Sequence, residues 1–278
     1  MKSSLKVGVY ADVSNMYLNG GHKMQYDILR EFAIRDGGEL IRLNAYVSYD
    51  PKRAKEDPEY RDGAKEFYSS LRDYGYKVIT KEVKSFRDKE TNEIFKKANA
   101  DLDLAVDVLL QSENLDKILI CTGDGDFIQV VQAIQNRGCR LEIVALDNSS
   151  YELRHEADMF VSGFLIPNLI PTKTSRKPNT PNWGEIGSRV RGVCYWYDKE
   201  KGYGFFKYLD KIKGGLWQTD TRNPDSPYKT AYFHASNFTN DSYVSGLPSR
   251  EYIFEFDLVS SGKNDGLQAT NIDLICKL

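Results

Sequence analysis

The pattern of apolar and polar positions changes character after about residue 165. Before it, short β-branched runs at 6–12, 40–50, 76–83, 117–123 and 140–146 alternate with stretches of helical periodicity at 26–37, 60–75, 101–112 and 127–138. Strands that alternate with helices predict a parallel sheet with helices on both faces, because each parallel connection must cross over the sheet. Right-handed crossovers narrow this prediction to a doubly wound α/β sheet.

The rest of the chain differs in composition and in the spacing of its apolar residues. Residues 166–185 concentrate proline, serine, threonine and basic residues without apolar periodicity, which indicates a linker. Five short runs rich in aromatic residues then follow, at 189–198, 202–209, 230–238, 251–259 and 267–275. Such runs, separated by turn residues, predict a small all-β barrel. We therefore predict an α/β domain at 1–171, a linker at 172–186 and a small all-β barrel at 187–278.

Composition and charge change this picture little. A chain of 278 residues suits two domains, and no apolar run approaches the roughly 18 residues that a membrane span needs. Polar residues interrupt the start before a signal-peptide core is complete, so we expect a cytoplasmic protein without membrane contact. Residues 1–170 carry 23 basic and 28 acidic side chains and the remainder 15 and 12, an asymmetry too mild to establish nucleic-acid binding.

The cysteines do not suggest a metal or disulfide framework. They have no CxxC spacing and no flanking histidines, so we expect reduced thiols in the core. They are Cys121, Cys139, Cys194 and Cys276.

Carboxylates collect where a doubly wound sheet would place its functional groups, outside the carboxyl ends of the strands. Asp12 ends the first strand, and Asp124 and Asp126 follow the strand that begins at residue 117. Asp101 begins a helix for which we predict a core stripe of apolar residues. That stripe is Leu102, Ala105, Val106 and Leu109.

Several ionised carboxylates in one shallow pocket repel one another unless a cation neutralises them. Mg²⁺ or Mn²⁺ suits such a site, because these ions prefer oxygen ligands and can activate water for phosphoryl displacement. We attribute the glycines around Asp124 and Asp126 to a tight turn. A structural alternative is that Asp101 and Asp126 only stabilise helix starts. Asn15 is equally suited to capping a helix and to holding substrate.

Three other aspartates are weaker candidates for the metal site. Asp103 and Asp107 fit a solvated helix face, although Asp107 could reach the rim of the pocket, and Asp158 has the weakest case.

Four segments carry a family resemblance over most of residues 5–165. "VYADVSNMY", "ADLDLAVDVLL", "CTGDGDFIQVVQAIQNRGCRLEIVAL" and "LRHEADMFV" resemble the NYN family of the PIN-like nuclease superfamily. The resemblance implies metal-site roles for Asp12, Asp101, Asp124 and Asp126, with Asn15 nearby. The sequence departs from the family pattern in "KKANAD" before the helix and in Gly125 between the turn aspartates.

The aromatic strands of the second domain suggest a surface for unpaired bases. Period-2 alternation puts Tyr203 and Phe205 on one face of a strand, and Tyr232 and His234 on one face of another. Exposed rings could stack on bases, with Lys201 and Lys207 on phosphates. The alternative is that these rings belong to the core, where alternating aromatic positions are common.

A second resemblance covers residues 187–278. The segments that carry it are "GVCYWYDKEKGYGFFKY", "YFHASNF" and "YIFEFDLVSSGKNDGLQATNIDLI", which together resemble a cold-shock domain, an OB-type barrel. It implies that single-stranded nucleic acid contacts Trp196, Lys201, Tyr203, Phe205, Tyr232 and His234. Departures include Tyr195, Asp198, Ala235 and an insertion at 210–230, whose Trp217 either adds a stacking surface or pins the loop.

Together these patterns predict a metal-dependent endoribonuclease, with Mg²⁺ or Mn²⁺ at the carboxylates and single-stranded RNA on the barrel. A non-catalytic RNA-binding regulator and a nuclease for single-stranded DNA remain alternatives. A homodimer through a sheet edge or through helix 64–75 also stays open.

Overall fold

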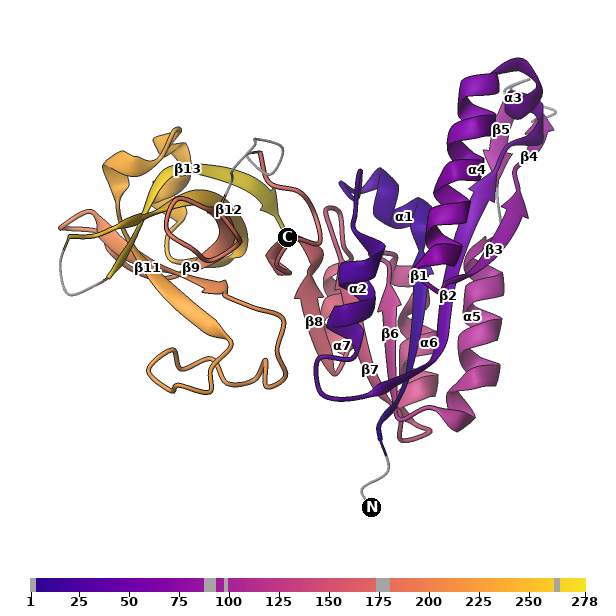
Figure 1. Ribbon diagram of the computed structural model, residues 1–278, viewed down its shortest axis with the longest axis horizontal. Coiled ribbons are helices and arrows are strands. Elements are labelled where there is room, and N and C mark those ends of the chain that lie inside the picture. The colour runs from indigo at the N-terminus through magenta and orange to yellow at the C-terminus, as the bar shows by residue number, and fades with distance from the viewer. Residues whose placement is uncertain (1–3, 88–93, 98–99, 174–180, 263–265) are drawn as a thin grey trace. The chain divides into compact units, whose positions relative to one another are not determined.

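The computed structural model describes residues 4–87, 94–97, 100–173, 181–262 and 266–278 (Figure 1). Contacts between residues divide the chain into two compact units. The first comprises Met1–His22 and Gly37–Phe160, and the second comprises Lys23–Asp36 and Val161–Leu278.

A six-stranded sheet organises the first unit. Its strands are β1 (Lys6–Asp12), β2 (Glu39–Tyr49), β3 (Lys77–Glu82), β6 (Lys117–Cys121), β7 (Arg140–Ala145) and β8 (Met159–Ser162), in the order β3-β2-β1-β6-β7-β8. The pairs from β3 through β7 are parallel, which confirms the parallel α/β sheet. The chain builds outward from β1 through β2 to β3 and then continues at β6, on the other side of β1. The switch in strand order therefore lies between β1 and β6.

Helices connect these strands. They are α1 (Val13–Leu18), α3 (Pro51–Glu56), α4 (Pro58–Asp73), α5 (Ala100–Gln111), α6 (Ile128–Gln135) and α7 (Tyr151–Glu156), with α2 (Tyr26–Ala33) grouped in the second unit. Short 3-10 turns are η1 (Ser112–Asn114), η2 (Gly125–Phe127), η3 (Gly163–Leu165), η4 (Ala235–Asn237) and η5 (Asp241–Gly246). An antiparallel pair that sequence patterning did not predict joins β4 (Lys84–Arg87) to β5 (Ile94–Lys97).

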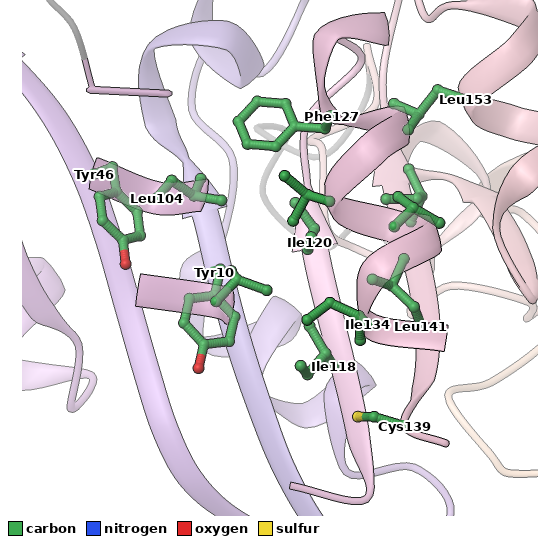
Figure 2. Close-up of a cluster of buried hydrophobic side chains, with 14 of the residues drawn as sticks. Tyr10, Tyr46, Leu104, Ile118, Ile120, Phe127, Ile134, Cys139, Leu141 and Leu153 are labelled. Atoms are coloured by element: carbon green, nitrogen blue, oxygen red, sulfur yellow. The ribbon is translucent and has the colours of Figure 1, made fainter. Parts of the chain in front are cut away.

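The core of the first unit lies between the sheet and helices α5 and α6. Figure 2 shows Tyr10 and Tyr46 from neighbouring strands beside Leu104 of α5, with Ile120 of β6 facing the residues of α6. The predicted stripe of α5 is wrong in part. The buried residues of α5 are Ala100, Leu104 and Val108, whereas Leu102 and Val106 of the predicted stripe are 57% and 44% exposed. Ala105 and Leu109 are partly buried against the same core.

The second unit contains a closed five-stranded barrel, which confirms the predicted all-β domain. Its strands are β9 (Arg189–Asp198), β10 (Tyr203–Leu209), β11 (Tyr228–His234), β12 (Ser249–Ser260) and β13 (Leu267–Lys277), in the order β10-β11-β13-β12-β9. Stacked rings fill its interior: the centroid of Phe206 lies 4.3 Å from that of Phe233 and 4.7 Å from that of Phe256.

A buried ionic network fixes the chain that leads into the barrel. The carboxylate of Glu255 accepts hydrogen bonds from Arg189 Nε at 2.7 Å and from Arg191 Nε at 2.8 Å. Arg191 also donates to the carbonyls of Ile170 and Pro171, both at 2.9 Å. The backbone at 170–171 is therefore held on the barrel by charged hydrogen bonds. Residues 174–180 of the predicted linker lie outside the described residues.

All four cysteines are buried, as expected, and none of them is in a disulfide. Burial raises the pKa of Cys139 to about 11 and that of Cys194 to about 12, so both stay protonated at neutral pH. Within the described part of the chain, no helix is long and apolar enough to cross a membrane.

Candidate active site and nucleic-acid surface

Asp12 lies at the carboxyl end of β1, next to the switch in strand order. It is 3% exposed, and its two carboxylate oxygens have different partners. Oδ1 accepts a hydrogen bond from the backbone N–H of Asn15 at 3.0 Å, which caps α1. Oδ2 accepts one from the hydroxyl of Thr122 at 3.4 Å. Asp12 is thus held by α1, which follows it, and by the end of the neighbouring strand β6, and each oxygen keeps a further lone pair.

The turn after β6 carries the next two carboxylates. Asp124 caps η2 by accepting a hydrogen bond from the backbone N–H of Asp126 at 2.9 Å, so one of its oxygens is fixed. The following residue, Phe127, is 2% exposed and packs in the core of the first unit (Figure 2). The side chain of Asp126 is exposed. Burial of Phe127 therefore anchors the turn and leaves Asp126 at the surface.

Asn15 takes a role that sequence reasoning did not consider. Its side-chain Oδ1 accepts a hydrogen bond from the backbone N–H of Gly123 at 2.9 Å. Asn15 therefore ties α1, which follows Asp12, to the turn that holds Asp124. It positions the carboxylates, whereas the sequence offered it as a helix cap or a substrate contact.

The glycines of the turn are required by close approach. Neither Gly123 nor Gly125 has a positive φ, so the tight-turn explanation does not hold at these residues. A Cβ at residue 123 would lie 3.1 Å from Cα of Ser149, and one at residue 125 would lie 3.0 Å from Oγ of Ser150. The backbone N–H of Ser150 also donates to the carbonyl of Gly123 at 2.8 Å. The turn is held between Asn15 and the segment after β7.

The electrostatics of Asp12 show which carboxylates act on one another. The pKa of Asp12 is raised from 3.8 to about 6, mainly by burial and also by the charges of Asp101 and Asp124, while its hydrogen bonds to Asn15 and Thr122 act to lower it. Three of the four predicted carboxylates therefore share one electrostatic neighbourhood. The charge of Asp126 is not among the largest effects on the pKa of Asp12.

The donor set suits a hard divalent cation that keeps some of its water. Among the described residues, no three histidine, cysteine, aspartate or glutamate side chains are grouped so that they could hold an ion by themselves. Mg²⁺ commonly binds through one or two carboxylates and completes its shell with water and substrate phosphate. Asp12 and Asp124 supply oxygen donors of this kind, and a cation would relieve the repulsion that raises the pKa of Asp12.

The weaker aspartate candidates have structural partners. The carboxylate of Asp103 accepts a hydrogen bond from Lys81 Nζ at 2.7 Å, and that of Asp107 accepts one from the hydroxyl of Tyr46 at 2.8 Å. Asp158 accepts the backbone N–H of Leu141 at 2.7 Å. Asp107 therefore faces the sheet core through Tyr46, and Asp158 completes the hydrogen bonding of β7.

Sequence reasoning missed residues that surround these carboxylates. Thr122 is fully buried and lies between Asp12 and the backbone N–H of Asp124, which donates to its hydroxyl at 3.3 Å. Tyr151 follows Ser150 and is 57% exposed, with the ring of His155 at 3.9 Å. The polar run "DNSSY" directly after a buried strand was the available signal for this segment.

On the barrel, the predicted aromatic residues form one continuous surface across β9, β10 and β11. Strand pairing places Phe205 opposite both Trp196 and Tyr232. The ring of Trp196 lies 5.3 Å from Tyr203 and 5.8 Å from Phe205. Tyr232 lies 5.8 Å from Tyr203 and 5.9 Å from Phe205. We call Trp196, Tyr203, Phe205 and Tyr232 the aromatic platform. It belongs to the outer face, because Phe206 and Phe233 alternate with it and fill the interior.

A β-bulge enlarges this surface beyond what the pattern predicted. The register between β9 and β10 shifts at Phe205/Phe206, so that Trp196 pairs with Phe205 and Cys194 pairs with Phe206. The extra residue, Tyr195, is consequently exposed beside Trp196, each to 41%. Bulges commonly redirect side chains in this way.

His234 and Lys201 border the platform. Nδ1 of His234 accepts a hydrogen bond from the backbone N–H of Ser236 at 3.2 Å, so the proton of the neutral ring lies on Nε2. The backbone N–H of Lys201 is fixed by Asp198 at 3.0 Å, and its side chain is exposed. Both residues can donate hydrogen bonds to phosphate.

Comparison with known proteins bears on the first unit. The family model of the NYN domain matches residues 6–167, more than half of the chain. The Low amplitude and bright protein LabA of Synechococcus elongatus is 28% identical over 162 residues, which are 56% of this chain and 82% of that protein. A solved protein of unknown function from Vibrio parahaemolyticus aligns with 58% of this chain and 96% of its own, at 23% identity and a TM-score of 0.45. The chain belongs to the NYN domain family.

Proposed function

We propose that the protein is a metal-dependent endoribonuclease that cuts single-stranded RNA held by its barrel. The observation that carries this proposal is the buried carboxyl of Asp12 at the switch in strand order, with its pKa raised to about 6 by burial and by the charges of Asp101 and Asp124. A fold rarely keeps repelling carboxylates together for stability alone, and perturbed pKa values concentrate at functional sites. Membership of the NYN family, whose resemblance to PIN-like nucleases rests on these residues, supports the same chemistry.

Each residue has a definite task in this proposal. Asp12 and Asp124 offer carboxylate oxygens whose orientation is fixed by Asn15, Thr122 and the N–H of Asp126. Mg²⁺ or Mn²⁺, when bound, would neutralise charge on the scissile phosphate and favour ionisation of water.

Asp101 adds negative charge on the helix side, and exposed Asp126 can orient an attacking water. Attack of water on phosphorus with departure of the 3′ oxygen leaves a 3′-hydroxyl and a 5′-phosphate, so no protein nucleophile is required.

The barrel supplies the substrate side of the proposal. The aromatic platform offers ring faces in contact with one another, and base stacking is worth roughly 1–3 kcal/mol per base in such sites. We infer that the barrel is of the OB type, similar to a cold-shock domain, with Lys201 and His234 on the phosphates. Because ring stacking tolerates every base, the site would hold RNA of many sequences.

Asp124→Asn tests the proposed endoribonuclease activity with little structural disturbance, because asparagine can also cap η2. We would follow 5′-labelled single-stranded RNA and the matching DNA with Mg²⁺, Mn²⁺ or EDTA. We expect metal-dependent RNA cleavage by the wild type, and loss of cleavage with retained binding in the variant. Asp103→Asn is the matched control, since Asp103 pairs with Lys81 and should leave cleavage intact.

The outcomes separate the alternatives. RNA that is bound but stays intact with every metal would refute the enzyme and favour the non-catalytic RNA-binding regulator. Cleavage of DNA at the rate of RNA would contradict the RNA preference and make the protein a nuclease for single strands in general.

A further inference from the structure

Trp217 is the most exposed of the three tryptophans and lies in a loop of the barrel. The loop between β10 and β11 spans residues 210–227 and extends from the barrel in orange in Figure 1. Trp217 is 72% exposed. By contrast, the indole N–H of Trp183 donates to the carbonyl of Leu209 at 2.8 Å. An exposed indole ring of this kind offers a face on which a base can stack.

Other residues hold the loop in place. Leu216 is 5% exposed, and its carbonyl accepts a hydrogen bond from the hydroxyl of Tyr228 at 3.1 Å. The hydroxyl of Ser226 donates to the carbonyl of Gln218 at 2.7 Å. Trp217 is thus presented between two anchored residues. Of the two roles that the sequence left open, pinning the loop belongs to Leu216.

The outer positions of β10 and β11 lead from the aromatic platform toward this loop, and the last of them on β10, Leu209, is buried at 3% exposure. Strand register pairs Phe205 with Tyr232, Lys207 with Thr230 and Leu209 with Tyr228, all at alternate positions of β10 and β11. From Tyr203 to Leu209 this face extends about 20 Å, at roughly 3.3 Å per residue. It ends at Tyr228, whose hydroxyl holds the loop.

A cation lies midway along this face. Nζ of Lys207 is 5.9 Å from the ring centroid of Tyr195, which neighbours Phe205 of the platform at 6.5 Å, and 5.4 Å from that of Tyr228 at the base of the loop. Burial and the positive charge of Arg250 lower the pKa of Lys207. A phosphate beside Lys207 would offset both unfavourable effects.

A groove borders the same face. Its volume is about 930 Å³, and Phe205, Thr230 and Tyr232 line it together with Gln268 of β13 and Thr221 of the loop. The volume lies at the upper end of the range for ligand sites. The loop therefore forms one wall of the space next to the platform.

We propose that Trp217 is a second stacking station for single-stranded nucleic acid, which reaches it across Lys207 after occupying the aromatic platform. This inference rests on the proposed RNA-binding function of the barrel. A flexible protein segment would not require a cation between two ring surfaces, whereas a strand alternates bases with phosphates. The anchored loop also presents the ring in advance, which reduces the ordering cost on binding.

A length series of oligouridylates tests the proposal by fluorescence anisotropy with the full-length protein in EDTA. We would compare oligomers of about 4 and about 12 nucleotides, which span most of the usual site sizes. For the longer oligomer, Trp217→Ala should weaken binding by about 5- to 150-fold, equivalent to roughly 1–3 kcal/mol per stacked base. For the shorter oligomer it should change nothing, because such a strand fits on the platform.

Control variants separate this inference from the proposed function. Thr219→Ala changes a neighbouring exposed residue and should bind both oligomers as the wild type does. Lys207→Met should reduce the salt dependence for the longer oligomer by about one counterion, whereas Trp217→Ala should leave that slope unchanged.

If Trp196→Ala weakens binding while Trp217→Ala binds both lengths normally, the second station is refuted and the platform stands. If the wild type binds neither oligomer, RNA binding by the barrel is wrong, and this inference falls with it.

Discussion

Replacing Asp12 by asparagine should stabilise the cation-free protein, although we expect it to abolish cleavage. The variant keeps the helix cap, because an asparagine oxygen can accept the N–H of Asn15, and Thr122 can pair with an amide as well as with a carboxylate. The change therefore removes mainly the negative charge of a side chain that is 3% exposed.

The magnitude and sign follow from the pKa of Asp12. A rise from 3.8 to about 6 on folding corresponds to about 3 kcal/mol, at 1.36 kcal/mol per pH unit. Because the folded state holds this proton more tightly than the unfolded state, the contribution is favourable below about pH 4. It is lost as the pH rises through about 6. The advantage of Asp12→Asn should therefore grow from nearly zero at pH 4 to about 3 kcal/mol at pH 7.

The distribution of chromophores allows the two units to be followed separately. All three tryptophans, Trp183, Trp196 and Trp217, lie in the second unit, whereas all helices except α2 lie in the first. Urea unfolding in EDTA, followed by far-ultraviolet circular dichroism, reports the first unit, and tryptophan fluorescence should stay unchanged. Added Mg²⁺ should stabilise the wild type and not the variant. Equal or lower stability of Asp12→Asn at pH 7 would refute the reasoning.

Two further substitutions test structural assignments. Glu255→Gln should lower the unfolding free energy of the barrel by about 3–5 kcal/mol, because it leaves buried Arg191 without its carboxylate, whereas Arg189 keeps Asp257 and Asp273. Tryptophan fluorescence in urea measures this change, and exposed Glu251→Gln on the same strand should have no effect. Asp158→Ala should lower the unfolding free energy of the first unit by about 1–3 kcal/mol, because it leaves the buried N–H of Leu141 unpaired. RNA cleavage per folded molecule should persist, and loss of cleavage at full stability would place Asp158 in the site instead.

Much of the fold could be predicted because the strands are strongly patterned. β1 and β6 are buried along almost their whole lengths, as strands covered on both faces must be, and they appear in the sequence as continuous apolar runs. The barrel strands alternate between interior rings such as Phe206 and outer rings such as Phe205. Where burial repeats at a fixed period, the sequence predicts the strand. The predicted end of β1 then gives the position of Asp12 in the fold.

Helix α5 shows where periodicity fails. Its apolar residues surround almost the whole helix, so two stripes, one through Leu102 and one through Leu104, fit the sequence equally well. The polar contacts decide between them: Lys81 on β3 pairs with Asp103, and Tyr46 on β2 bonds to Asp107. These partners are far away in sequence, so no local pattern could have selected the stripe that contains Leu104.

The bulge at Tyr195 has a similar origin. Strict alternation would bury either Tyr195 or Trp196, and only the paired strand β10 shows that the register shifts there. The pattern identified Trp196 as a contact residue through its resemblance to a family motif, but the doubled aromatic surface depends on strand pairing.

In the turn after β6, the motif predicted where Asp124 lies but not which contacts hold it there. Its spacing indicated that Asp124 would lie near Asp12, and the mutual effect of their charges agrees with this. The glycines, however, serve the approach of Ser149 and Ser150, and Asn15 holds the backbone of Gly123 from the other side. The position of Asp124 thus depends on two segments more than 100 residues apart in the chain. Asn15 lies three residues after Asp12 and contacts both sides of the site, because its backbone N–H donates to the Asp12 carboxylate and its side chain accepts from the N–H of Gly123. A cation shared by Asp12 and Asp124 would therefore meet donors already held at a fixed separation, and its affinity should depend on Asn15 although Asn15 itself provides no charge.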